Sequence, residues 1–164
     1  MVFGSAARPP YGNPLVQKSL WAFWDTSGIA NSNTEMLGFW ANEDDWKPLV
    51  DTSVANVKAT VYVVQGNGKS HNGRGQSSTF GHMVVAVASW EQVPTSVMLE
   101  FDWGAISAKL KGWPASHQHL SQVVVEQPFI ALVQNASSFA VDEPIPIQPR
   151  RGMLLIVSLK VAQP

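Results

Sequence analysis

The chain has 164 residues, of which 45% are hydrophobic and 14% charged, with a net charge of -1 and no cysteine. This length predicts one domain with a two-layer core, and the hydrophobic fraction excludes intrinsic disorder. The lack of cysteine excludes disulfides, and the lack of a basic run argues against electrostatic binding of nucleic acid. No run of about 18 apolar residues occurs, so we expect no membrane insertion, and we expect no secretory signal peptide at the N-terminus.

Short runs of alternating apolar residues dominate the chain, and helical periodicity is almost absent. The Gly- and Pro-rich residues 1–17 predict a linker or extended entry arm, and residues 18–164 predict a single β-sandwich domain. The pattern predicts an all-β fold, an antiparallel β-sandwich that is jelly-roll-like. The predicted strands, in chain order, are 19–25, 36–40, 57–64, 79–90, 96–103, 105–110, 121–126, 129–134 and 153–161.

The last third of the chain has two features of its own, a possible strand break at Pro128 and an apolar closing segment. Segments 121–126 and 129–134 form either two strands or one strand broken at Pro128, and the proline-rich residues 135–149 predict a loop. The closing segment 153–161 is apolar on both faces. That pattern predicts a central position in its sheet or a contact with another subunit.

Three groups of polar residues suggest metal or nucleotide chemistry. His117 and His119 are spaced to point to one side of an extended segment and could share a metal, although the pattern favours two solvated histidines in a surface loop. Asp44 and Asp45, in an acidic loop, are candidates for calcium, against a simple solvated loop. The run Gly68-Lys69-Ser70 ends like a phosphate-binding loop, but Val63 stands where that motif needs its first glycine. We therefore expect no nucleotide, and no cofactor of any kind.

The pattern places Glu100 and Asp102 on one face of a predicted strand, and the strand rise puts them about 7 Å apart. That separation lies in the range used by pairs of carboxylates in glycoside hydrolysis. Outward charges on a sandwich strand are also ordinary solvated residues. An enzyme that processes glycosides is therefore a third interpretation, after the two given below.

Tryptophan gives the clearest indication of function, because seven occur in a short chain. Trp24, Trp90 and Trp103 fall in strand patterns and are predicted to be core residues. Tryptophan in loops is enriched at contact sites, although such rings could instead cap the open ends of the sandwich. Together with charged residues of the same loops, the candidate binding residues are Trp40, Asp44, Asp45, Trp46, Lys69, His71, Arg74, Trp113, His117 and His119.

The turn and strand from Val93 to Trp103, the final run from Gly152 to Val161 and the long polar loops resemble the coat proteins of small icosahedral RNA viruses. Such proteins begin with an arginine-rich arm, whereas the first 40 residues here hold only Arg8 and Lys18. The chain therefore resembles the protruding domain of nodavirus-, tetravirus- and tombusvirus-like capsids, including those of insect and bee viruses. The resemblance implies a surface domain that clusters as dimers or trimers.

From this resemblance we expect a non-enzymatic capsid domain on the virion surface, which associates with itself and offers its loops to a host receptor. That receptor could be a glycan. The alternative is a carbohydrate-binding module or lectin in which Trp40, Trp46 or Trp113 stacks on sugar rings.

Overall fold

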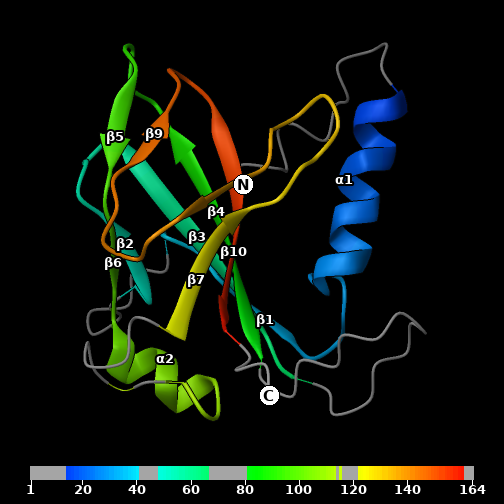
Figure 1. The fold of residues 1–164 in the computed structure, drawn as a ribbon, viewed down its shortest axis with the longest axis vertical. Coiled ribbons are helices and arrows are strands. Elements are labelled where there is room, and N and C mark those ends of the chain that lie inside the picture. Colours follow the sequence, from blue (N-terminus) through cyan, green and yellow to red (C-terminus); the bar gives the residue numbers. More distant parts are fainter. Residues whose placement is uncertain (1–13, 41–47, 67–80, 114, 116–121, 161–164) are drawn as a thin grey trace.

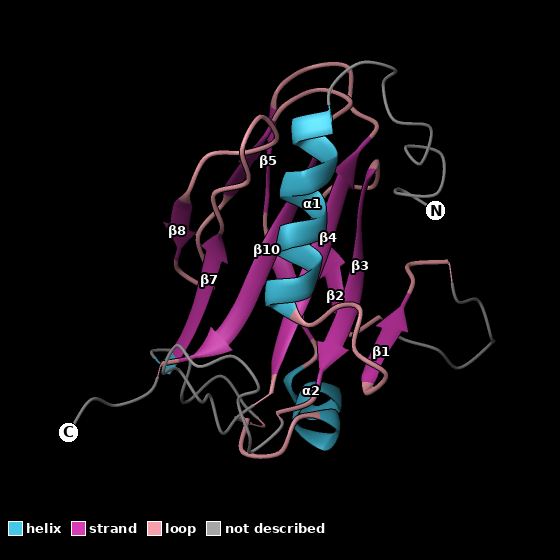
Figure 2. Ribbon diagram, turned by 90° about the vertical axis from the view of Figure 1, so that its right-hand side faces the viewer, coloured by secondary structure: helices cyan, strands magenta, loops and turns pink. Residues whose placement is uncertain are grey.

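The computed structural model describes residues 14–40, 48–66, 81–113, 115 and 122–160. They form three layers, which Figures 1 and 2 show from two sides. A six-stranded sheet lies in the middle, helix α1 (Pro14–Ser27) covers one face, and two small sheets with helix α2 (Trp103–Lys109) pack on the other face. The predicted all-β antiparallel sandwich is confirmed, and the helices are additions to it. Neither helix is long and apolar enough to cross a membrane, as far as the described residues go.

The central sheet has the strand order β1-β3-β4-β10-β7-β8, and all its pairings are antiparallel. In the second layer β2 pairs with β6 and β5 pairs with β9, again antiparallel. The strands are β1 Thr34–Leu37, β2 Val50–Thr52, β3 Val57–Val64, β4 His82–Ser89, β5 Thr95–Val97, β6 Leu99–Phe101, β7 Val123–Gln127, β8 Ser137–Phe139, β9 Ile145–Ile147 and β10 Gly152–Leu159.

Strands β4 and β10 are largely apolar on both faces because both faces of the central sheet are covered. Val85 and Leu155 belong to the main core between the two sheet layers, whereas Val84 and Leu154 belong to a second core beneath α1. Strand β10 lies between β4 and β7, so its predicted central position is confirmed. The cover for its second face comes from α1 of the same chain.

The predicted strand over residues 19–25 is wrong, because this segment lies within α1. Leu20, Phe23 and Trp24 lie three and four residues apart and face the second core, the spacing of one helix face. The run is so uniformly apolar that strand and helix periods both fit it. The helix also includes the last four residues of the predicted linker, and it ends at Gly28, whose φ of +76° is the left-handed conformation that glycine tolerates.

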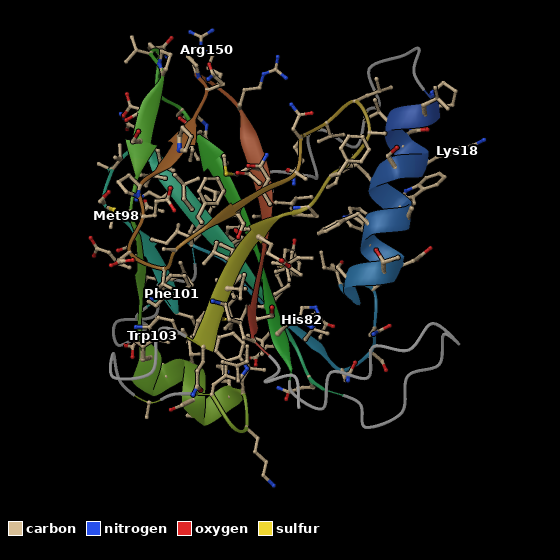
Figure 3. The ribbon with its side chains drawn as sticks, viewed as in Figure 1. Lys18, His82, Met98, Phe101, Trp103 and Arg150 are labelled. Carbon is tan, nitrogen blue, oxygen red and sulfur yellow. The ribbon has the colours of Figure 1, made fainter. Side chains whose placement is uncertain are left out.

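The predicted strand over residues 105–110 is also wrong, because α2 occupies most of it. Asp102 caps this helix, and its Oδ1 accepts a hydrogen bond of 3.1 Å from the backbone N–H of Ala105. The helix buries Trp103 and Ile106 in the main core. Phe101 stacks on Trp103 at a centroid distance of 4.8 Å and so joins the helix to β6 (Figure 3).

The predicted strand 96–103 is divided at Met98, where the chain changes its partner. Before this residue β5 pairs with β9, and after it β6 pairs with β2. Met98 donates its backbone N–H to the Ser53 hydroxyl at 2.9 Å and accepts a bond from the Ser53 N–H at 3.1 Å. Residues 129–134 form a turn rather than a strand, and the predicted loop 135–149 contains β8 and β9.

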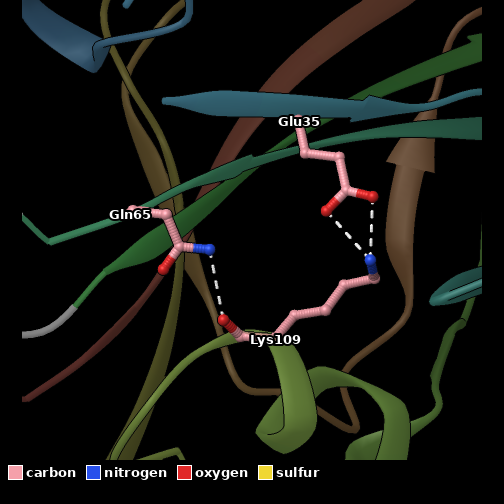
Figure 4. A network of polar contacts seen from close by, with 3 residues as sticks. All are labelled: Glu35, Gln65 and Lys109. Atoms are coloured by element: carbon pink, nitrogen blue, oxygen red, sulfur yellow. Dashed lines mark hydrogen bonds and ion pairs between the residues drawn. The ribbon is translucent and has the colours of Figure 1, made fainter. Parts of the chain in front are cut away.

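A polar contact joins α2 to the edge of the central sheet (Figure 4). Lys109 lies 2.8 and 2.9 Å from the two carboxylate oxygens of Glu35 on β1. Gln65, just after β3, donates its side-chain N–H to the Lys109 carbonyl at 3.2 Å. Both charged side chains are partly exposed, so the ion pair itself contributes only about 0–1 kcal/mol.

Candidate functional site

Two of the ten predicted binding residues, Trp40 and Trp113, lie in the part of the chain that the structure describes. For the others the binding, calcium and histidine-metal interpretations stay predictions. Among the described residues no group of three or more His, Asp or Glu side chains could hold a metal ion. The predicted residues that lie outside the described ranges are Asp44, Asp45, Trp46, Lys69, His71, Arg74, His117 and His119.

Trp113 is a core residue, so its predicted role as a stacking platform is wrong. Its side chain is only 5% exposed and belongs to the main core. The indole Nε1–H donates a buried hydrogen bond of 3.0 Å to the carbonyl of Gly81, just before β4. A ring used in this way has no free face for a ligand.

Trp40 is exposed and held in a fixed orientation. Its side chain is 44% exposed, and its ring lies over Gly38, where an added Cβ would come within 2.6 Å of the ring carbons. The absence of a side chain at Gly38 therefore provides the space for the indole. The neighbouring Phe39 meets the ring edge to face, at a centroid distance of 5.1 Å and an interplanar angle of 88°.

Trp90 is the second exposed ring of this group, which corrects its prediction as a core residue. It follows directly after β4 and its side chain is 50% exposed. Phe39 contacts it with a centroid distance of 6.1 Å and an angle of 63°. Phe39, Trp40 and Trp90 thus form an aromatic cluster, in which Phe39 contacts each of two half-exposed indoles.

Backbone hydrogen bonds fix the segment that carries Trp90. Its N–H donates to the Asn56 carbonyl at 2.9 Å, and its carbonyl accepts a bond from the Gln92 side chain at 3.4 Å. The guanidinium of Arg150 donates to the side-chain oxygen of Gln92, and the backbone N–H of Arg150 donates to the Glu91 carbonyl at 3.2 Å. Arg150 has a φ of +52°, a conformation rare for residues with a side chain, and lies at one end of the molecule (Figure 3).

The aromatic cluster offers what a saccharide needs. A pyranose ring has an apolar C–H face that is buried well against a flat indole, and its hydroxyl groups bond to polar side chains at the rim. Trp40 and Trp90 supply two exposed indoles, and Gln92 with Arg150 supplies polar groups beside Trp90. The arrangement is suited to hold a sugar by stacking.

The predicted pairing of Glu100 and Asp102 on one strand face is wrong. Strand β6 ends at Phe101, so only Glu100 lies on the strand, where its side chain is exposed. Asp102 uses its carboxylate to cap α2. A carboxylate with that role is held by a helix N-terminus rather than aimed at a partner across the strand.

His82 is the histidine among the described residues; it is the first residue of β4, is partly buried and lies beside the end of α1 (Figure 3). Burial lowers its pKa, and the hydrogen bond with the Ser27 carbonyl opposes this effect only in part. The ring Nε2 lies 2.8 Å from that carbonyl oxygen. Because a carbonyl can only accept, Nε2 carries the proton, and the neutral ring joins the end of α1 to the start of β4.

A sequence comparison identifies one related family. The sequence model described as Glycoside hydrolase 123, C-terminal domain, matches residues 76–158, just over half of the chain. The match includes strands β4 to β9, α2, Trp90 and all but the last residue of β10, whereas Phe39 and Trp40 precede it. No curated protein and no solved structure matches the chain significantly.

The match overturns the predicted viral identity. The related family is one of glycoside hydrolases, so the expectations of a capsid protein, a virion location, a host-attachment role and a non-enzymatic class are wrong. The features that carried the resemblance were a proline turn, alternating strands and polar loops. They are common to many unrelated β-sandwiches, because a sheet that packs on one face alternates in polarity and its strands are joined by polar turns. The carbohydrate-binding alternative agrees better with this family.

Proposed function

The chain belongs to the family defined by the C-terminal domain of glycoside hydrolase 123, and from this premise we propose that it binds carbohydrate for a glycoside hydrolase. The aromatic cluster of Phe39, Trp40 and Trp90 is the contact surface. The observation that carries the proposal is the pair of half-exposed indoles, each of which contacts Phe39. Because the family is one of glycoside hydrolases, a sugar is the expected ligand of these exposed rings.

Titration of the chain with a panel of neutral oligosaccharides, followed by tryptophan fluorescence, tests the proposal. We expect saturable quenching by at least one class of sugar. Trp90→Ala and Trp40→Ala should each weaken that binding about tenfold or more, as expected for an aromatic anchor. Trp21→Ala is the matched control, because Trp21 on α1 is 57% exposed and makes no ring contact with the cluster.

Gly38→Ala gives an independent test, since it keeps all three rings but removes the space under Trp40. We expect it to weaken binding nearly as much as Trp40→Ala does. Equal affinity of the wild type and the Trp40, Trp90 and Gly38 variants for every sugar that binds would refute the cluster as the contact surface.

A further inference from the structure

A groove lies beside the edge of β10, separate from the aromatic cluster. Its volume is about 480 Å³, and its lining includes Gln127, Gln134, Gln148, Arg151, Gly152 and Met153. These residues come from the end of β7, from the turn after it, and from the segment that leads from β9 into the first residues of β10. The groove therefore forms only when three separate parts of the chain come together.

The groove exists because β7 leaves β10 at Pro128. The register pairs Ile156 of β10 with Glu126 of β7, and the same register would place Leu154 opposite Pro128. Proline has no N–H to donate, so regular pairing ends there. The side chain of Gln134 takes over, with Oε1 accepting from the Leu154 N–H at 2.9 Å and Nε2 donating to its carbonyl at 2.8 Å. Beyond this point no strand of the described chain pairs with that side of β10.

The side chains around the groove leave donor groups available. The side chain of Gln134 is hydrogen-bonded to the backbone of Leu154 and Pro128. Within the described residues, no hydrogen bond involves the side chains of Gln127, Gln148 or Arg151. The lining includes no carboxylate. Two amides and one guanidinium therefore face a space with an excess of positive charge, where an anionic group is favoured.

We propose that this groove binds the carboxylate of a uronic acid unit, with Arg151 as its main contact. The inference rests on the proposed carbohydrate binding. A guanidinium holds a planar carboxylate through two parallel hydrogen bonds, while Gln127 and Gln148 supply amides for the neighbouring hydroxyls. The groove also adjoins the end of β4, directly before Trp90, because the Arg151 carbonyl accepts a bond of 2.9 Å from the N–H of Ser89.

Calorimetric titration of the full chain with a galacturonic acid trisaccharide and with its neutral methyl ester tests the inference. We expect the acid to bind about tenfold more tightly than the ester, and this preference to fall as salt is raised. Arg151→Gln should abolish the preference, and Arg151→Lys, which keeps the charge but not the planar fork, should keep only part of it. Lys111→Gln is the control for charge, because Lys111 is exposed and follows α2.

The outcomes separate the two proposals. If acid and ester bind equally and both are weakened by Trp90→Ala, carbohydrate binding stands and the acidic site is refuted. If Lys111→Gln removes the preference as fully as Arg151→Gln does, net charge explains it and the site is refuted. Tighter binding of a sulfated galactose trisaccharide than of the galacturonate would overturn the carboxylate assignment. If none of the three saccharides binds, both proposals fail for this class of ligand.

Discussion

The side-chain amide of Gln134 binds both backbone polar groups of Leu154, its N–H at 2.9 Å and its carbonyl at 2.8 Å. In this position the glutamine replaces one residue of a strand. Both groups of Leu154 would otherwise be left unpaired, because Pro128 stands opposite them in the register of β7 and β10. The contact closes the edge of β10 and fixes the turn that forms one wall of the groove.

Gln134→Leu should lower the free energy of unfolding by about 1–3 kcal/mol, because it leaves two partly buried backbone groups without partners. Denaturation by urea measures the change. Gln122→Leu is the control, since Gln122 is exposed and its side chain makes no hydrogen bond among the described residues. Equal stability of the two variants would show that water satisfies Leu154 and that the glutamine is dispensable.

The stability of the fold should fall as the pH is lowered below about 6.5, the usual pKa of histidine. Burial lowers the pKa of His82 in the folded chain, so the native state favours the neutral ring. Its contribution is therefore fully present above the unfolded pKa and is lost as the pH falls toward the folded pKa. His82→Gln can still donate to the Ser27 carbonyl but does not titrate. We expect it to flatten this part of the pH profile, and parallel profiles for variant and wild type would contradict the assignment.

Gly81→Ala should destabilise the fold by about 1–3 kcal/mol. A Cβ at this position would come within 2.6 Å of both the Val64 carbonyl oxygen and Cδ2 of Leu110, and backbone cannot move aside at low cost. Gly104→Ala is the opposite case, because its nearest atom lies at 3.6 Å and the residue is in α2. That variant should be neutral or gain up to about 1 kcal/mol. Thermal unfolding should show a lower melting temperature for Gly81→Ala and an equal or higher one for Gly104→Ala than for the wild type.

Asp102→Ala should cost about 1 kcal/mol through loss of the α2 cap, whereas Asp102→Asn keeps a capping oxygen and should cost much less. Chemical denaturation of the two variants provides the comparison. If both variants lose equal stability, the negative charge matters more than the cap.

The sequence indicates that one indole of the aromatic cluster, that of Trp40, is exposed, but it does not indicate this for Trp90. Trp40 was identified by its position in a loop next to polar residues, a context in which indoles are more often exposed. For Trp90 and Trp113 the structure reverses the prediction: Trp90 is half-exposed and Trp113 is buried. Trp90 follows a regular strand pattern but lies where β4 leaves the sheet, whereas Trp113 sits in a loop that folds back against Gly81. No local sequence pattern predicts the hydrogen bonds of Gln134 or the exposure of Arg151.

The sequence by itself determined the class of the fold, because the alternation along β3 and the short apolar runs of β4 and β10 are local properties that each strand encodes in its own residues. It also determined where β7 ends, since Pro128 cannot donate a hydrogen bond. Only the tertiary structure decided that a helix, α1, covers the second face of the sheet where a strand is predicted. It also decided which tryptophans face solvent and which three segments meet to form the groove. The physical reason is that burial and donor availability depend on which distant segment packs against a residue, and a local pattern does not contain that information.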